Sequence, residues 1–235
     1  MRAILLAAGF GTRLRPLTDT VPKCLVPIKG RPLLGIWLQN LKHAGIGPFL
    51  INTHYMADKV TAYIDASEFS EQATLAHEPA LLGTAGTLKA NVGFFGDDEG
   101  LLIHADNYCS PDFRAFMRAH RDRPAGCMIT MMTFRTDSPS SCGIVELDER
   151  GVVVGFHEKV SSPPGNLANG AVYILSKEFL GALNAEFPCA TDFSTEVLPH
   201  FVGRILSHET KGFFLDIGTP AAYAMANAMS PAAAA

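Results

Sequence analysis

A glycine-rich stretch near the N-terminus carries the clearest chemistry in the sequence. Gly9 and Gly11 allow backbone N–H groups to turn inward, which creates a concave anion site. Thr12 adds a hydroxyl donor, and Arg13 adds a permanently charged planar fork that suits phosphate oxygens. Lys23 follows in the sequence and can bring a second cation back to the same place. These residue types together predict a site for a polyphosphate.

Other phosphate-binding motifs fit this stretch poorly. A Rossmann dinucleotide loop requires glycine at the position of Leu14, and a Walker A loop ends in Gly-Lys-Ser or Gly-Lys-Thr, which is missing here. A Gly-x-Gly pair alone is also compatible with a tight turn that binds nothing. The longer string Gly9-Phe10-Gly11-Thr12-Arg13-Leu14 is much more specific than its glycines.

The composition excludes several classes of protein. The 235 residues carry a net charge of −4, which gives no support to a nucleic-acid-binding protein held by phosphate contacts. With 48% hydrophobic and 18% charged residues, the chain can bury a core. No apolar run approaches the roughly 20 residues that span a bilayer, and the apolar stretch 3–8 is too short for a signal peptide. We therefore expect a cytoplasmic protein with neither a membrane nor a nucleic acid as partner.

The cysteines indicate the same compartment. They form neither a CxxC pair nor a spacing typical of zinc sites. We expect free, buried thiols in a reducing cytoplasm. The five are Cys24, Cys109, Cys127, Cys142 and Cys189.

Short apolar runs alternate with longer amphipathic stretches through the first 135 residues. This alternation predicts an α/β fold with a Rossmann-like, mostly parallel sheet and helices on both faces. Ligands of such sheets bind at the carboxyl ends of the strands, and both the 9–13 stretch and Asp106-Asn107 fall at such ends. The expected strands are 3–8, 49–53, 73–77, 100–105 and 127–134, and the expected helices are 32–44, 57–64, 86–94 and 111–120.

From Cys142 onward the pattern changes. Residues 143–147 and 152–158 alternate around the polar turn 148–151, which predicts a β-hairpin. We predict a single domain over residues 1–235, in which this small β-rich part forms a lid or insertion. The later elements expected are a strand at 169–175, a helix capped by Ser176, a strand at 213–216, a helix at 220–228 and a frayed tail.

Several strings resemble the sugar-1-phosphate nucleotidylyltransferase family. Gly-x-Gly-Thr-Arg-Leu-x-Pro-Leu-Thr from Gly9, followed by Pro22-Lys23, is similar to the family signature, although Ala8 stands where many members have glycine. The resemblance covers nearly the whole chain. The later matching strings are Gly83-Thr84-Ala85-Gly86 for the base-reading turn, Asp106-Asn107 for the metal-binding strand end, Gly143-Ile144-Val145 with Glu158-Lys159 for the sugar-binding segment, and Leu215-Asp216-Ile217-Gly218-Thr219 for the late metal-binding motif.

The resemblance implies a reaction. A sugar 1-phosphate oxygen attacks the α-phosphorus of a nucleoside triphosphate (NTP), which gives a nucleotide-sugar and pyrophosphate without a covalent enzyme intermediate. Arg13, Lys23 and Asp106 are the implied catalytic residues; Arg13 neutralises the departing pyrophosphate and Lys23 contacts the α-phosphate. Asp106 and Asp216 are the implied ligands of Mg²⁺, with Mn²⁺ as a substitute, because carboxylate oxygens select hard cations. The alternative for a strand-end Asp is a helix N-cap or a turn residue.

The implied substrate contacts divide between a nucleotide-binding half, about 1–135, and a sugar-phosphate-binding half, about 136–228, with a tail at 229–235. Lys159 is expected to hold the sugar phosphate, although a lone lysine is by default a solvated surface residue. The implied nucleotide contacts are Ala8, Gly9, Gly11, Thr12, Arg13, Lys23, Glu78, Gly83 and Thr84. The implied sugar-phosphate contacts are Asn107, Gly143, Glu158, Lys159 and Asn169.

Glu78 indicates which base is used. A carboxylate only accepts hydrogen bonds, and guanine offers two adjacent donors, N1–H and the 2-amino group. Uracil and thymine offer one donor flanked by acceptors, which a carboxylate repels. Glu78 therefore favours GTP among the NTPs. The alternative is that Glu78 is a solvent-facing loop residue.

Within the family, the short form is most similar to the heptose-1-phosphate guanylyltransferases of capsule and lipopolysaccharide pathways. The sequence leaves open a mannose-1-phosphate guanylyltransferase, or uridylyl or thymidylyl transfer to a hexose 1-phosphate. It also leaves open a catalytically silent paralogue that senses nucleotide-sugars, and a cytidylyltransferase for alcohol or choline phosphate. The methionine and phenylalanine content allows a homodimer.

Overall fold

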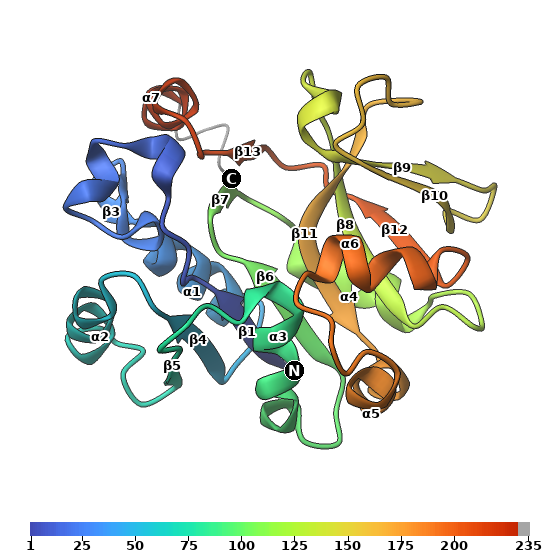
Figure 1. Cartoon of the computed structure of the whole chain (residues 1–235), viewed down its shortest axis with the longest axis horizontal. Coiled ribbons are helices and arrows are strands. Elements are labelled where there is room, and N and C mark those ends of the chain that lie inside the picture. The colour runs from blue at the N-terminus through green and yellow to red at the C-terminus, as the bar shows by residue number, and fades with distance from the viewer. Residues whose placement is uncertain (230–235) are drawn as a thin grey trace. The chain divides into compact units, whose positions relative to one another are not determined.

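The computed structural model describes residues 1–229, which form two compact units (Figure 1). The first unit contains Met1–Leu81, Ile103–Pro111 and the chain from Gly212 onward, and the second contains Leu82–Leu102 and Asp112–Lys211. The chain therefore passes twice from the first unit into the second and back. The predicted halves, about 1–135 and 136–228, stay a prediction. The expected frayed tail at 230–235 lies outside the described residues.

The first unit is built on a parallel sheet with the order β6-β1-β4-β5, to which β6 contributes its last residues. β1 pairs with β4, and β4 with β5, in parallel register. All five residues of β4 are buried, as expected for a strand of a parallel sheet that is covered on both faces. The strands are β1 (Arg2–Leu6), β2 (Pro27–Ile28), β3 (Arg31–Pro32), β4 (Phe49–Thr53), β5 (Ala73–His77), β6 (Gly100–His104), β7 (Asn107–Cys109) and β13 (Phe214–Asp216); the helices are α1 (Leu33–His43), α2 (Ala57–Asp65) and α7 (Pro220–Ala228).

The second unit contains a mainly antiparallel sheet. β9 lies between β10 and β11, and β8 pairs with β11 in antiparallel and with β12 in parallel register. An aromatic cluster fills its core, in which the rings of Tyr173 and Phe179 both contact Phe193. The strands are β8 (Ile129–Arg135), β9 (Gly143–Leu147), β10 (Val153–Glu158), β11 (Leu167–Leu175) and β12 (Ile205–Glu209); the helices are α3 (Gly83–Ala90), α4 (Phe113–Arg121), α5 (Lys177–Glu186) and α6 (Phe193–Glu196).

Most elements lie where the sequence predicts them. The strands 49–53 and 73–77 match residue for residue, and the Ser176 hydroxyl caps α5 by accepting from the N–H of Phe179. The helix predicted at 86–94 instead runs from Gly83 to Ala90, because the glycine-rich turn forms its first turn. Strand β12 was not predicted: it pairs with β8 from a distant part of the chain, and Ser207-His208-Glu209 shows no apolar alternation.

The result is a mainly parallel α/β sheet with Rossmann-like character, accompanied by small antiparallel sheets. One contact ties this frame to the candidate site: the indole N–H of Trp37 on α1 donates to the carbonyl oxygen of Asn107 on β7 at 2.9 Å, next to Asp106. Among residues 1–229, the structure contains no helix with the length and apolar character needed to cross a membrane.

His120 is a buried titratable group of the second unit. Its side chain is 1% exposed and its two ring nitrogens lie 2.7 Å from Thr130 Oγ1 and 3.1 Å from Glu99 Oε1. Burial lowers the pKa of His120 to about 4; the Glu99 carboxylate opposes this shift, and the nearby Arg123 guanidinium reinforces it. The imidazole is therefore neutral in the folded chain at neutral pH.

The His120→Gln variant should show a weaker loss of stability in acid than the wild type. The unfolded histidine takes up a proton near pH 6.5 whereas the folded one resists until about pH 4, so stability present above pH 6.5 is lost as the pH falls through this window. Urea unfolding at pH 7, 6 and 5 measures the difference. The exposed His43→Gln is the control, and equal slopes for His120→Gln and wild type would contradict this account.

Candidate active site

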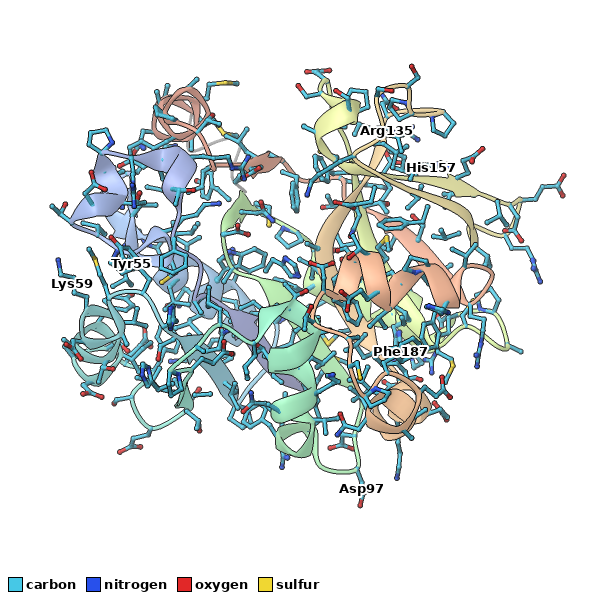
Figure 2. All side chains as sticks on the ribbon, in the orientation of Figure 1. Tyr55, Lys59, Asp97, Arg135, His157 and Phe187 are labelled. Carbon is cyan, nitrogen blue, oxygen red and sulfur yellow. The ribbon has the colours of Figure 1, made fainter. Side chains whose placement is uncertain are left out.

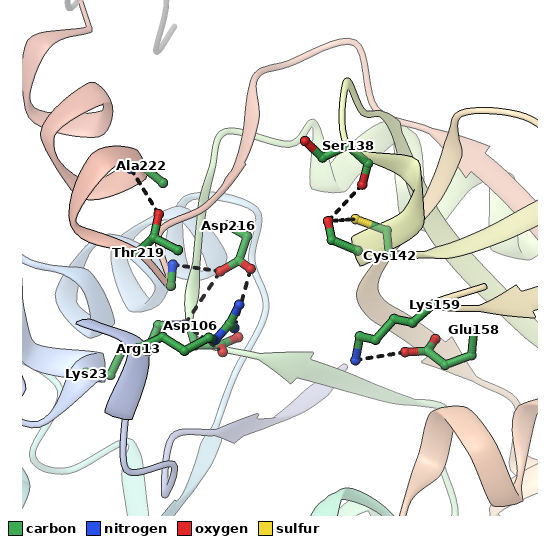
Figure 3. A network of polar contacts seen from close by, with 12 residues as sticks. Arg13, Lys23, Asp106, Ser138, Cys142, Glu158, Lys159, Asp216, Thr219 and Ala222 are labelled. Carbon is green, nitrogen blue, oxygen red and sulfur yellow. Dashed lines mark hydrogen bonds and ion pairs between the residues drawn. The ribbon is translucent and has the colours of Figure 1, made fainter. Parts of the chain in front are cut away.

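Four charged side chains of the first unit meet in one cluster (Figure 3). The ammonium of Lys23 lies 2.9 Å from Asp106 Oδ2 and 3.6 Å from Asp216 Oδ1. Arg13 Nη2 lies 3.7 Å from Asp216 Oδ2. The cluster therefore brings Arg13, Lys23 and Asp106 together with Asp216, which comes from the C-terminal motif.

Lys23 is held at the bottom of this cluster and is 8% exposed. It begins a short 3-10 helix, Lys23–Leu25, after Pro22. Gly11, in the left-handed region with φ 63°, packs so closely that a Cβ there would lie 3.0 Å from Lys23 Cβ. Lys23 is therefore not the solvated surface residue that a lone lysine is by default. Gly11 has no Cβ, so it leaves room for the aliphatic part of the Lys23 side chain.

Asp216 reaches the cluster through strand pairing. β13 pairs with β7 in antiparallel register, with Asp216 opposite Asn107, so it comes next to Asp106. Asp216 Oδ1 also accepts from the N–H of Gly218 at 2.8 Å, which makes it a turn residue as well. A Cβ at Gly218 would lie 2.8 Å from Arg13 Nη2, so a side chain at position 218 would displace the guanidinium.

The loop that carries Arg13 is anchored from α2 and the turn before it. Tyr55 Oη donates to the carbonyl oxygen of Thr18 at 2.9 Å, and Lys59 Nζ donates to that of Thr20. Figure 2 labels Tyr55 and Lys59. Thr18 Oγ1 in turn donates to the carbonyl oxygen of Gly11 at 2.8 Å. The side chain of Arg13 is 67% exposed, so a fixed backbone presents an accessible cation.

The charges of the cluster favour the ionised form of Asp106. Burial by itself would raise the pKa of the Asp106 carboxyl, but the charge and hydrogen bond of the Lys23 ammonium, together with the charge of His104 and a backbone hydrogen bond, hold this pKa below its usual value. Within residues 1–229, no group of three or more His, Cys, Asp or Glu side chains is placed to hold a metal. The donor set is thus two carboxylates, which matches Mg²⁺ sites that take one or two carboxylates and complete their shell with phosphates and water.

The other predicted residues of this unit are placed as follows. Ala8 is buried, whereas Gly9 is exposed and a Cβ there would meet no atom within 4 Å. Thr12 is exposed and begins the short 3-10 helix that contains Arg13. Asn107 is buried at the start of β7. The glycine-rich stretch thus presents exposed backbone and side chains beside the charged cluster.

Glu78 is 3% exposed, so its reading as a solvent-facing loop residue is wrong. Its Oε1 accepts from Asn52 Nδ2 at 2.9 Å, and Asn52 Oδ1 accepts from the N–H of Ala7 at 2.7 Å. Asn52 was not among the residues predicted from the sequence. Its signal was available, because it is a polar residue near the carboxyl end of the apolar run 49–53, as Asp106 is beside its own strand.

In the second unit, the predicted base-reading turn packs against its own unit. Gly83 has φ 77°, and a Cβ there would lie 2.4 Å from the carbonyl oxygen of Thr191. Thr84 Oγ1 accepts from the N–H of Phe193 at 2.7 Å. This arrangement explains why glycine is needed at position 83.

The predicted sugar-phosphate contacts of the second unit gather on β9, β10 and β11. Lys159 Nζ pairs with Glu158 Oε1 at 3.0 Å (Figure 3), and a Cβ at Gly143 would lie 2.4 Å from Glu158 Oε2. Asn169 Nδ2 donates to Tyr173 Oη at 2.7 Å across a bulge in β11. The side chain of Lys159 is 66% exposed, so it remains accessible to an anion.

Comparisons with known proteins agree on one family. The model of the family described as "Nucleotidyl transferase" matches residues 2–232. Mannose-1-phosphate guanyltransferase of Aspergillus fumigatus is 30% identical over 94% of this chain, and the mannose-1-phosphate guanylyltransferase catalytic subunit beta of Xenopus tropicalis is 30% identical over 94%. The chain spans 61% and 62% of the lengths of these two curated relatives.

Two solved structures are similar over nearly the whole chain. HddC from Yersinia pseudotuberculosis, in complex with GMP-PN, is 26% identical with a TM-score of 0.80 and covers 97% of this chain and 98% of its own. A chain from Bacillus anthracis is 23% identical with a TM-score of 0.83, covers 97% and 94%, and shows the shared fold.

Lys23→Met should raise the pKa of Asp106. Without the ammonium, the burial of the carboxylate loses its largest opposing interaction, so the pKa of Asp106 should rise. A titration of the Asp106 carboxyl ¹³C resonance by NMR measures this. Lys42→Met is the matched control, because Lys42 pairs with Glu68 elsewhere in the same unit; an unchanged Asp106 pKa in Lys23→Met would refute the account.

Proposed function

Because the chain belongs to the nucleotidyl transferase family, we propose that it transfers a nucleoside monophosphate from an NTP to a sugar 1-phosphate. The observation that carries this proposal is the cluster of Lys23 between Asp106 and Asp216, with Arg13 beside it. The cluster combines one exposed cation, Arg13, and one buried cation, Lys23, with two carboxylates, next to a glycine-rich loop. A polyphosphate requires such cations and backbone N–H groups, and its metal ion requires carboxylates.

The proposed chemistry brings two anions together. An oxygen of the sugar 1-phosphate forms a bond to the α-phosphorus, the bond from that phosphorus to the bridging oxygen breaks, and pyrophosphate leaves with the electron pair. Lys23 contacts the α-phosphate, and Arg13 neutralises the charge that grows on the leaving pyrophosphate. Lys159, with Glu158 as its partner, binds the sugar phosphate. Catalysis thus consists of alignment and charge neutralisation.

GTP is the proposed nucleotide. The two curated relatives carry guanylyl transfer in their names, and the similar HddC structure contains GMP-PN. The buried carboxylate of Glu78 supports the same base, because it accepts and never donates. For the acceptor, the sequence resemblance favours a heptose 1-phosphate, and the names of the relatives make mannose 1-phosphate the second candidate. We further propose that the reaction takes place in the cytoplasm.

Mg²⁺ is the proposed cation, with Asp106 and Asp216 as its ligands. The two carboxylates lie on either side of the Lys23 ammonium, with Arg13 beside Asp216, and carboxylate oxygens are ligands that Mg²⁺ prefers. When bound, the ion would polarise the phosphate oxygens. The protein residues then orient the two substrates around it.

A pyrophosphate-release assay of four NTPs against a panel of hexose and heptose 1-phosphates tests the proposal. We expect release only when both substrates are present, with the highest kcat/KM for GTP and a heptose or mannose 1-phosphate. A higher kcat/KM for UTP or dTTP would replace guanylyl by uridylyl or thymidylyl transfer. If the protein binds a nucleotide-sugar but releases pyrophosphate with no pair of NTP and sugar 1-phosphate, it is a catalytically silent paralogue that senses nucleotide-sugars.

Metal dependence is expected in the same assay. Excess EDTA should abolish release, and Mg²⁺ or Mn²⁺ should restore it. Asp106→Asn and Asp216→Asn should each lower kcat by orders of magnitude while circular dichroism shows an intact fold, because each removes a charged ligand. The exposed Asp122→Asn, far along the chain on the turn after α4, is the matched control. Full activity in excess EDTA would contradict the metal assignment.

A further inference from the structure

A cavity of about 480 Å³ lies within the second unit. This volume falls in the range of roughly 300–1,000 Å³ that is typical of small-molecule sites. Its lining comes from three segments: the end of α4 with the turn that follows it (121–128), the first turn of α5, and the turn before β12. None of the lining residues is among the predicted catalytic, nucleotide or sugar-phosphate contacts, so the cavity is separate from the contacts assigned above.

Backbone hydrogen bonds join the three segments around the cavity. The N–H of Met128 donates to the carbonyl oxygen of Arg204 at 2.8 Å, and the N–H of Ser176 donates to that of Met128 at 2.9 Å. The turn after α4 closes on itself, because the N–H of Cys127 donates to the carbonyl oxygen of Pro124 at 3.1 Å. The walls of the cavity are therefore built from hydrogen-bonded backbone.

Three guanidinium groups and one carboxylate line the cavity. One of the three, Arg123, is held by the protein itself. Its Nε donates to the carbonyl oxygen of Cys127 at 2.9 Å and its Nη1 donates to that of His120 at 2.7 Å. Nη1 also lies 3.3 Å from Glu99 Oε1. Arg123 is therefore a paired and fixed part of the wall.

Arg204 and Arg121 are the cations that remain accessible to a ligand. The guanidinium of Arg204 lies over the Phe201 ring, 5.5 Å from its centroid, and donates to Met128 Sδ. It forms no ion pair in the part of the chain that the structure describes. Arg121 lies 3.7 Å from its neighbour Asp122, and both of these side chains are exposed, so their attraction is weak.

The single carboxylate of the lining belongs to Glu178. It lies in the first turn of α5, where a negative charge compensates the positive end of the helix dipole. The lining therefore sets three cations against one carboxylate whose charge already serves the helix. This balance favours an anionic ligand.

The turn after α4 adds hydrogen-bond donors. Gly126 has φ 91°, as at the third position of a type II turn. A Cβ there would meet no atom within 4 Å, so the space beside the turn is open. Among residues 1–229, the backbone N–H groups of Ala125 and Gly126 donate to no protein acceptor, and both residues are exposed. Such N–H groups in turns are suited to phosphate oxygens.

We propose that this cavity is a second ligand site of the protein and that it binds a phosphate group, either as inorganic phosphate or on a small organic ester. The guanidinium groups of Arg204 and Arg121 bind the phosphate oxygens, because their planar forks match phosphate geometry. The two N–H groups of the turn supply further donors. Cys127 and Met128 leave an apolar wall for the organic part of an ester. The site goes beyond the proposed transfer reaction.

An NMR titration of the Ala125 and Gly126 amide resonances in the full chain locates the binding. The probes are inorganic phosphate and mannose 1-phosphate, at an ionic strength held constant with sodium chloride. We expect saturable shifts with both, and a lower Kd for mannose 1-phosphate, because the cavity has room for more than a phosphate ion. Equal Kd values would support the site with inorganic phosphate as its ligand.

Variants test which side chains bind the phosphate. Arg204→Gln and Arg121→Gln should each raise Kd about tenfold, on the scale of hydrogen bonds to charged groups. Arg118→Gln is the matched control and should bind as the wild type does, because Arg118 is an exposed arginine of α4 outside the lining. Circular dichroism checks the fold. Arg204→Lys keeps the charge without the planar fork and should give an intermediate Kd.

The remaining outcomes overturn the inference. With neither probe giving a saturable shift at Ala125 and Gly126, the cavity binds no phosphate. Equal losses in Arg118→Gln and Arg204→Gln would show attraction by general positive charge alone. Lys159→Ala should leave these shifts unchanged; if it abolishes them, they report the proposed substrate site and the second site is refuted. The shifts require no turnover, so a chain without transferase activity that still shows them refutes the proposed function and leaves this inference standing.

Discussion

A single ammonium group between two carboxylates organises the candidate site. Lys23 is almost fully buried, and a buried charge is tolerated only when it is paired. Its partners Asp106 and Asp216 come from segments more than 100 residues apart, and the pairing of β7 with β13 brings them together. The folded chain therefore holds these positive and negative side chains in place by pairing them with one another.

Close packing around two glycines makes this arrangement possible. Gly11 leaves space for the stem of Lys23, and Gly218 leaves space for Arg13 beside Asp216. A Cβ at either position would force a charged side chain to move. The glycines of these motifs thus leave space for the two cations.

In the second unit, glycines likewise leave space for close contacts. Gly83 allows α3 to approach the Thr191 carbonyl, and Gly143 allows Glu158 to fold over β9, where it pairs with Lys159. Asn169 is oriented by Tyr173 across the bulge of β11. Each predicted contact residue of this unit is held by a neighbour from its own sheet or helix, so the unit presents a preorganised set of polar groups.

The sequence by itself determined the alternating strands and helices of the parallel sheet, because apolar periodicity and glycine turns are local signals. It also predicted Arg13, Lys23, Asp106 and Asp216 as site residues, because their motifs are contiguous strings, and the structure brings these four side chains together. Only the tertiary structure decided that Lys23 bridges both aspartates, that Glu78 is buried, and that Asn52 links it to Ala7. It also revealed β12, whose pairing with β8 leaves no local pattern. The physical reason is common to all of these: each depends on strand register between distant segments, which no local sequence pattern encodes.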